Sequence, residues 1–312
     1  MGMGKATPAL IVGAVILGLS GLSGCGGQPV PTAPASSPSV PVSSPTAPAT
    51  STSPGAPPPS PSQTADASYG VFIGLDPENA RVLYDYRTVV IDAAYFTKAD
   101  LTALKKKGIR VYSYLNVGSI ESFREGYSEF KNKTLGKYED WPGEYWMDVS
   151  LPAWQAYIDK AAAALVQKGV DGFFIDNTDV YYEYPKKSIL NGLVTILTNL
   201  SAYHKDILIN GGDVFVTEAV LKPAKPMVEI TGVNQECLFT AINFDNDTFG
   251  TQTSEDHAYY KKYLDKVKAA GYAVYLTEYA AKNKTALRKK INDYCASQGY
   301  GCFIATSLDL DR

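Results

Sequence analysis

Residues 151–179 have the sequence LPAWQAYIDKAAAALVQKGVDGFFIDNTD, and this stretch decides the fold class. Pro152 stands at the start of a helical pattern over 151–168, and Gly169 follows its end, as is typical of a helix. The apolar run 172–176 then indicates a buried strand that ends in a carboxylate, Asp176. A helix, a glycine and a buried strand in this order form the repeating unit of a parallel α/β sheet.

The same unit recurs along the chain. Short apolar runs predict eight strands, at residues 70–75, 89–95, 110–116, 172–176, 207–210, 232–236, 273–278 and 301–307. Helical patterns cover 98–107, after a Thr97 cap, and 151–168, 188–203, 257–270 and 285–298. Glycines at 108, 169, 271 and 299 stop four of these helices. Eight such units within residues 68–312 predict an α/β fold, a single-domain (β/α)8 TIM-type barrel, over an open doubly wound sheet.

The segment before this domain has a different composition. Twelve of the 19 prolines lie between Pro29 and Pro61, and no charged residue occurs between Lys5 and Asp66. Such a segment cannot bury enough apolar surface to offset the entropy of ordering it. We therefore expect residues 25–67 to be a disordered Pro/Ser/Thr-rich linker, and residues 68–312 to be the folded domain.

Residues 1–24 have the pattern of a signal peptide. Lys5 supplies a positive charge, and residues 9–19 form an apolar core that is too short to span a bilayer. The following Leu22-Ser-Gly-Cys25 resembles the bacterial lipobox, which implies lipidation of Cys25. The resemblance predicts an exported cell-surface or periplasmic lipoprotein attached to the bacterial membrane. The alternative is an ordinary signal peptide with an incidental cysteine.

Charge and cysteine content exclude several classes of function. Lys and Arg total 29 against 32 Asp and Glu, a net charge of −3, and no basic stripe suits nucleic acid. Two His residues and the absence of a CxxC pair argue against a metal site. Cys295 and Cys302 could form a disulfide, which would leave Cys237 as a free thiol. We expect a monomer without metal or organic cofactor.

Polar residues at the strand ends are the candidates for function, because barrel active sites lie at the carboxyl ends of the strands. Asp176 and Glu236 directly follow apolar runs on the fourth and sixth strands. Two carboxyl groups on one rim suit sugar hydrolysis, since one can attack while the other holds a proton for the leaving oxygen. Tyrosine-rich loops favour a carbohydrate ligand. Residues at other strand ends are candidate substrate-binding residues: Asp92, Tyr95, Tyr114, Asn116, Asp179, Asn210, Asn234 and Glu278.

These motifs together resemble glycoside hydrolase family 114. The resemblance rests on Asp171-Gly-Phe-Phe-Ile-Asp176-Asn-Thr-Asp179 and Asn234-Gln-Glu236, and it extends over residues 69–312. The family includes endo-α-1,4-polygalactosaminidases, which implies a (β/α)8 barrel that hydrolyses α-1,4-linked galactosamine polymers. It also implies Asp176 as nucleophile, Glu236 as acid/base, and retention of configuration. The first strand lacks the Trp-rich opening of many members, which leaves the exact polymer open. The alternative is a surface glycan-binding barrel without turnover.

Overall fold

The structure is a computed structural model that describes residues 68–139 and 141–312. The predicted signal peptide, Cys25 and the linker lie outside the described residues. Among those described, no helix has the length and apolar character needed to cross a membrane.

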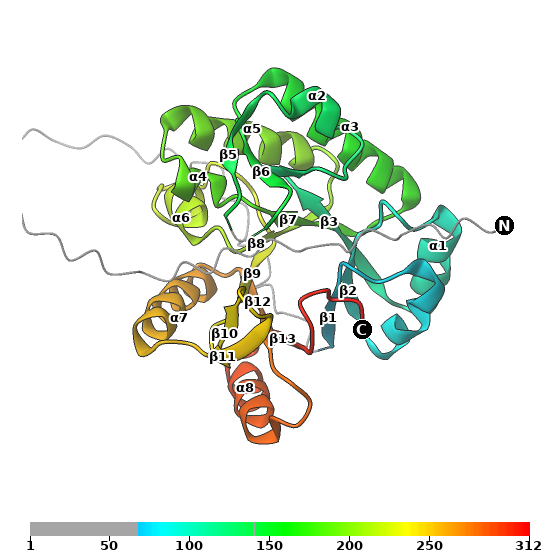
Figure 1. The fold of residues 1–312 in the computed structure, drawn as a ribbon, viewed down its shortest axis with the longest axis vertical. Helices are drawn as coiled ribbons and strands as arrows, with labels where there is room; N and C mark the ends of the chain where they lie inside the picture. Colours follow the sequence, from blue (N-terminus) through cyan, green and yellow to red (C-terminus); the bar gives the residue numbers. More distant parts are fainter. Residues whose placement is uncertain (1–67, 140) are drawn as a thin grey trace, which may run out of the picture. The chain divides into compact units, whose positions relative to one another are not determined.

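Eight parallel strands form a nearly closed barrel, which confirms the predicted TIM-type fold (Figure 1). Around the barrel the strands follow their order in the chain. The rings of Phe72 and Phe303 meet at 5.0 Å between centroids, where the first strand lies beside the last. The strands are β1 (Tyr69–Phe72), β2 (Thr88–Ile91), β3 (Arg110–Asn116), β7 (Gly172–Asp176), β8 (Asp206–Asn210), β9 (Gly232–Glu236), β12 (Ala273–Tyr279) and β13 (Gly301–Ala305).

Five long helices alternate with these strands, as the sequence predicts. They are α1 (Lys98–Lys106), α3 (Pro152–Lys168), α5 (Lys187–Ser201), α7 (Ser254–Ala269) and α8 (Thr285–Gln298). Thr97 and Asp100 form a reciprocal capping box at the start of α1. The predicted start of α7 at residue 257 is wrong, because the Thr253 hydroxyl accepts from the backbone N–H of Asp256 and the helix begins at Ser254.

Short elements complete the connections. A 3-10 helix, η1 (Pro77–Asp85), joins β1 to β2, and α4 (Val180–Glu183), α6 (Asp213–Val216) and the π-helical turn η2 (Thr217–Leu221) follow β7 and β8. The second predicted strand, 89–95, is too long, since β2 ends at Ile91. Asp92 and Tyr95 therefore lie in the connection after the strand. Cys237, Cys295 and Cys302 are free thiols, so the disulfide that the sequence left open is not formed.

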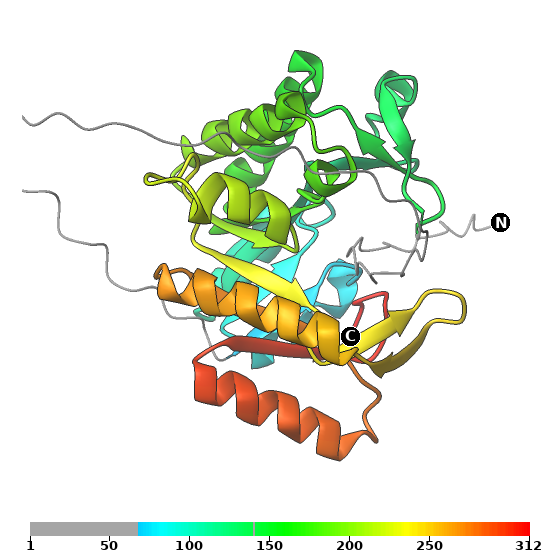
Figure 2. The same ribbon diagram turned by 90° about the vertical axis from the view of Figure 1, so that its left-hand side faces the viewer.

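Two insertions extend from the carboxyl ends of the strands, and the sequence patterns did not predict them. The β3–α3 connection contains α2 (Tyr127–Phe130) and an antiparallel sheet of β4 (Ser119–Glu121), β5 (Thr134–Lys137) and β6 (Glu144–Met147). The β9–α7 connection contains the hairpin β10 (Thr240–Asn243) and β11 (Thr248–Thr251). Figure 2 shows the hairpin projecting beyond the ends of the barrel strands. Both insertions therefore belong to the face where barrel active sites lie.

Candidate active site

Asp176 and Glu236 end β7 and β9, and Asn210, which ends the intervening β8, joins their side chains. The Nδ2 atom of Asn210 donates to Asp176 Oδ1 and to Glu236 Oε1, at 2.9 Å in each case. These two oxygens are therefore at most 5.8 Å apart, twice 2.9 Å. If the two N–H bonds diverge by about 120°, the oxygens lie about 5 Å apart. The structure thus brings the two predicted catalytic carboxyl groups together.

Hydrogen bonds behind Asn210 fix the orientation of its amide. Asn234 Nδ2 donates to Asn210 Oδ1 at 2.7 Å. Asn234 Oδ1 in turn accepts from the hydroxyls of Tyr69, at 3.2 Å, and Thr277, at 3.0 Å. Because hydroxyl donors occupy the carbonyl side of Asn234, its NH2 group faces Asn210, and the NH2 group of Asn210 faces the two acids. Asn234, predicted to bind substrate, is fully buried and has its polar atoms engaged within the protein.

The two acids differ in their hydrogen bonds. Glu236 accepts on both oxygens, since the Tyr279 hydroxyl donates to Oε2 at 2.6 Å. Asp176 accepts on Oδ1 alone, and its buried Oδ2 has no hydrogen-bond partner among the described residues. Asp176 therefore keeps one carboxyl oxygen that no protein donor occupies.

Burial and mutual repulsion set the protonation of this pair. Burial raises the pKa of Asp176 well above the ordinary carboxyl range, and the neighbouring charges of Glu236 and Glu144 raise that pKa further. Burial also raises the pKa of Glu236, while the bonds from Tyr279 and Asn210 lower it. Two carboxyl groups this close share a proton rather than ionise together. Glu236 accepts hydrogen bonds that lower its pKa on both oxygens, whereas Asp176 accepts one on Oδ1 alone.

Left-handed backbone turns the chain immediately after each acid. Asn177 has φ +64° and Cys237 has φ +57°, although neither is glycine. Asparagine tolerates this conformation, whereas cysteine adopts it rarely, so the position after Glu236 stores strain. Gly118 packs against the first of these turns, and a Cβ there would lie 1.7 Å from the carbonyl oxygen of Asn177. The glycine is therefore required for the close approach of the β3 connection to the end of β7.

Besides Glu236, another buried carboxyl group lies near Asp176. It belongs to Glu144, which the sequence analysis did not predict. Glu144, on β6, accepts at Oε1 from Asn116 at 3.1 Å, from Asn177 at 2.9 Å and from the Ser119 hydroxyl. Burial and the charge of Glu121 raise the pKa of Glu144 to about 8. Asn116, a predicted substrate-binding residue, therefore holds the insertion against the barrel rim.

Four predicted substrate-binding residues line a cavity of about 760 Å³ at the ends of β2 and β3: Asp92, Tyr95, Tyr114 and Asn116. Arg124 enters this cavity from the β3–α3 connection and joins two acids. Its Nη1 donates to Asp92 Oδ2 at 2.8 Å, and its Nη2 donates to Glu121 Oε1 at 3.2 Å. Tyr95 is 45% exposed and has the Arg124 guanidinium 5.9 Å from its ring centroid, whereas Tyr114 is buried. Asp92 is thus already paired with a cation of the protein.

Asp179 and Glu278 lie near the rim, but main-chain amides occupy their carboxylates. Both oxygens of Asp179 accept from Gly212 N at 3.1 Å. Glu278 accepts from the backbone N–H groups of Phe239 and Thr240, at 3.0–3.2 Å, and from the Thr240 hydroxyl at 2.6 Å. Asp179 therefore holds the turn after β8, and Glu278 holds the start of the β10–β11 hairpin. In the described part of the chain, neither carboxylate shares a hydrogen-bond donor with the acid pair, although the charge of Asp179 raises the pKa of Asp176.

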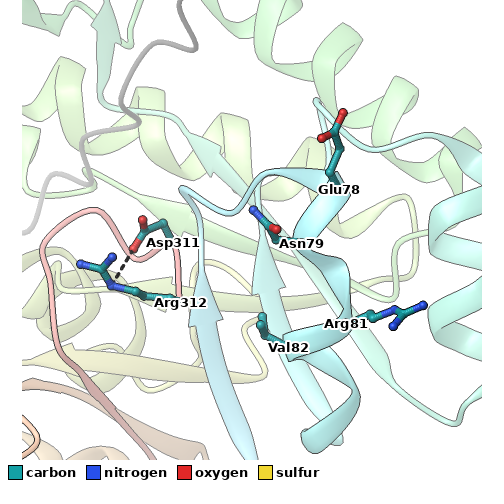
Figure 3. Close-up of a pocket in the computed structure, with 6 residues that line it drawn as sticks. All are labelled: Glu78, Asn79, Arg81, Val82, Asp311 and Arg312. Atoms are coloured by element: carbon teal, nitrogen blue, oxygen red, sulfur yellow. Dashed lines mark ion pairs between the residues drawn. The ribbon is translucent and has the colours of Figure 1, made fainter.

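Another cavity, of about 450 Å³, lies elsewhere on the molecule (Figure 3). It is formed by η1 and the C-terminal residues, where Arg312 Nε lies 3.6 Å from Asp311 Oδ1. None of the predicted site residues lines it. This cavity therefore gives no reason to place the candidate site away from the acid pair.

The predicted site omits Tyr279, although the sequence carries a signal for it. In the register of β12 with β9, Tyr275 pairs with Asn234, and Thr277 pairs with Glu236. Alternation along the strand puts Tyr279 on the same face and Glu278 on the other. Thr277 pairs with Glu236, so the residue two positions later on the same face is Tyr279. A choice by charge alone selects Glu278 instead. Glu144, Glu121 and Arg124 gave no comparable signal, because they lie in an insertion without clear periodicity.

Comparison with known proteins agrees with this geometry. The model of glycoside hydrolase family GH114 matches residues 46–311. The chain belongs to family GH114. It is therefore a glycoside hydrolase, as predicted, and the family match begins within the predicted linker. No curated protein sequence matches the chain.

Solved structures of similar fold include a glycoside hydrolase domain and a protein in complex with galactosamine. The glycoside hydrolase domain of PelA from Pseudomonas aeruginosa is 21% identical, with a TM-score of 0.68 over 78% of this chain and 97% of that one. Ega3 from Aspergillus fumigatus, in complex with galactosamine, is 16% identical, with a TM-score of 0.62 over 80% of this chain and 94% of that one. At these identities the likeness supports the barrel fold.

Proposed function

We propose that this family GH114 member hydrolyses an α-1,4-linked galactosamine-type polysaccharide with retention of configuration. Asp176 is the nucleophile, and Glu236 is the acid/base. The observation that carries the proposal is the shared Asn210 donor, which limits the two carboxyl oxygens to 5.8 Å. Retaining glycosidases separate their carboxyl groups by about 5–5.5 Å, whereas inverting enzymes need about 6.5–9.5 Å to admit a water.

The reaction follows from the two sets of hydrogen bonds. Asp176 Oδ2, which no protein donor occupies, attacks the anomeric carbon, while Glu236 gives its proton to the departing glycosidic oxygen. This step forms a glycosyl ester on Asp176 and breaks the glycosidic bond. Glu236 then takes a proton from water, whose oxygen attacks the same carbon and frees Asp176. Glu236 therefore acts in opposite protonation states in the two steps, while Asp176 passes from carboxylate to ester and back.

A cationic substrate supports this reaction by lowering the pKa of Asp176. Burial raises the pKa of Asp176, but attack requires Asp176 as the carboxylate. An ammonium group of galactosamine beside Asp176 lowers its pKa, because an opposite charge favours the ionised form. The proton of the pair then belongs to Glu236, where the leaving oxygen needs it. This coupling favours deacetylated over acetylated polymer, and the galactosamine bound to Ega3 is consistent with that preference.

A reducing-end assay on partially deacetylated α-1,4-galactosamine polymer tests the proposal. We expect release of reducing ends by the native chain, and a loss of at least about 1,000-fold in Asp176→Asn. Glu236→Gln should lose more activity on substrates with poor leaving groups than on substrates with good ones. Asp171→Asn, at the opposite end of β7, and Glu229→Gln, exposed before β9, are matched controls that should keep activity. Polymer binding without turnover by the native chain would overturn the proposal and favour a glycan-binding barrel.

The location of the enzyme is a separate proposal. The lipobox-like Leu22-Ser-Gly-Cys25 supports an exported lipoprotein, with residues 25–67 as a tether between the membrane and the barrel. In detergent phase separation, the mature native protein should partition with lipid, and Cys25→Ser should be released or remain unprocessed. Equal partitioning of the two proteins would contradict lipidation at this position.

A further inference from the structure

The seventh barrel strand supplies a tyrosine that contacts Glu236. This tyrosine was not among the predicted site residues. Tyr279 ends β12 and is 2% exposed. Its hydroxyl lies 2.6 Å from Glu236 Oε2, the oxygen that Asn210 does not reach. No other hydrogen bond of the Tyr279 hydroxyl is seen within the described residues. The phenol is therefore dedicated to one carboxyl oxygen of the proposed acid/base.

The hairpin after β9 holds Tyr279 from two sides. The backbone N–H of Tyr279 donates to the Thr240 hydroxyl at 3.1 Å, and Thr240 also donates to Glu278. The ring of Phe249, on β11, lies 5.4 Å from the Tyr279 ring between centroids, at 36° between their planes. The ring is thus fixed in position by an element that the barrel itself does not need.

A hydroxyl is the one partner here that suits both states of Glu236. It donates to an ionised carboxylate, and by rotating about its C–O bond it accepts from the protonated form. The amide NH2 of Asn210 can only donate. The proposed reaction requires Glu236 to lose its proton in the first step and regain it in the second, without moving. Tyr279 is the group in the structure that can follow this exchange.

We propose that Tyr279 is a positioning residue for the acid/base, and that it holds Glu236 in place through both protonation states while the β10–β11 hairpin holds Tyr279. The inference rests on the proposed function, because it assigns Tyr279 a role only if Glu236 exchanges a proton with the substrate.

Several titratable groups face Glu236 and bear on any pH dependence. In the described part of the chain, those that interact electrostatically with it are Asp176 on β7, Tyr69 on β1, Tyr279 on β12 and Cys237 in the next position. The three with hydroxyl or thiol groups all have a pKa raised by burial, so they are neutral over the working range. Asp176 is the only one of the four that titrates together with Glu236. Loss of the Tyr279 donor therefore changes the protonation of one coupled pair.

The test is the pH profile of kcat/KM for Tyr279→Phe, which keeps the ring against Phe249 and removes the hydroxyl. The bond from Tyr279 lowers the pKa of Glu236, so its loss should move the basic limb of the profile upward by about one pH unit. We expect kcat/KM at neutral pH to fall about 10- to 100-fold, mostly in kcat. Tyr263→Phe is a matched control: its buried hydroxyl has no partner among the described residues, and neither limb should move.

A second variant keeps the test decisive if Tyr279→Phe folds poorly. Phe249→Leu retains the Tyr279 hydroxyl but loosens its ring, and should shift the basic limb in the same direction by less. An unchanged profile in both variants would overturn the inference. If Glu236→Gln is as active as the native enzyme, the proposed function itself fails. If Glu236→Gln loses activity while Tyr279→Phe matches Tyr263→Phe, only the role of Tyr279 fails.

Discussion

Two groups of buried carboxylates lie at the same rim of the barrel, and they are compensated in opposite ways. Around Arg124, two acids, one directly after β2 and one in the β3–α3 connection, face one guanidinium at 2.8 and 3.2 Å. Around Asn210, the two acids of β7 and β9 share the neutral amide of Asn210, and Glu236 also accepts from the Tyr279 phenol. The first group is an ion-pair network, whereas within residues 68–139 and 141–312 no Lys or Arg bonds to the second.

This difference separates the acids around Arg124 from the proposed catalytic pair. A guanidinium stays charged at all relevant pH values, so Arg124 lowers the pKa of Asp92, although burial raises that pKa by more. Neutral donors stabilise a carboxylate less, and burial then raises its pKa toward the range where proton transfer is possible. A carboxylate at a strand end is therefore not enough to identify a catalytic group.

Removal of the shared neutral donor should have the largest effect. Asn210→Leu keeps a similar volume but leaves both acids without the amide that joins them. We expect kcat on galactosamine polymer to fall at least about 100-fold, because two hydrogen bonds to ionisable groups are lost. Asn191→Leu, on the exposed side of α5, is the control. An Asn210→Leu enzyme with nearly native kcat would show that the amide does not organise the pair.

Removal of the cation from the other group should mainly affect stability. Arg124→Leu leaves Asp92 and Glu121 buried without a counter-charge. Breaking such a buried network costs about 3–5 kcal/mol of unfolding free energy, which urea denaturation measures. Arg124→Leu combined with Asp92→Asn and Glu121→Gln should recover most of that loss. A loss below about 1 kcal/mol in the single variant would mean that solvent already screens the network.

The pH dependence of stability offers a third test, on two buried acids, Asp179 and Glu278, that accept hydrogen bonds from neutral donors. Burial and the charge of Asp213 raise the pKa of Asp179 to about 8, and burial raises that of Glu278 to about 7. An acid whose folded-state pKa exceeds its unfolded value, about 4, adds stability that is present at low pH and lost as pH rises through the folded value. The free energy of unfolding should therefore decrease by about 2 kcal/mol or more between pH 5 and pH 8.5.

Amide variants check the origin of that slope. Asp179→Asn and Glu278→Gln cannot ionise, so each should flatten the decrease in urea titrations over the same pH range. Asp265→Asn, a surface residue paired with Lys261, should leave the slope unchanged. A flat native profile would contradict the raised pKa values of the buried acids.

The smallest effect should come from the exposed face of the cavity at β2 and β3. Tyr95 is 45% exposed there, and Tyr95→Ala should raise KM about threefold to tenfold, since one sugar–aromatic contact is lost. Tyr84→Ala is the control, because Tyr84 has a similar exposure, 43%, and does not line this cavity. An equal KM for the two variants would exclude the cavity as a substrate subsite.

Most of the barrel could be predicted from sequence, because its signals are local. Buried strands, the Thr97 cap and the glycines after helices each depend on a few neighbouring residues. The short strands of the two insertions have three or four residues each and lack a clear period, so no pattern indicated them.

The site was predictable only in part, because its contacts are non-local. The two catalytic candidates follow apolar strands directly, which the sequence shows. The pairing of Asp92 with Arg124 joins residues 32 positions apart, and the capture of Glu278 by β10 joins residues 38 and 39 apart. These contacts turn predicted substrate acids into structural ones. Strand alternation could have selected Tyr279 instead of Glu278, had the register with β9 been known.

The configuration of the first product decides whether Asp176 and Glu236 act as a nucleophile and an acid/base at short separation. Proton NMR during early hydrolysis of an α-1,4-linked galactosamine oligomer resolves the new anomeric proton before mutarotation. The close pair joined by Asn210 predicts that the α-anomer appears first. Initial release of the β-anomer would require a water between the two carboxyl groups, and would contradict the assignment of Asp176 as nucleophile.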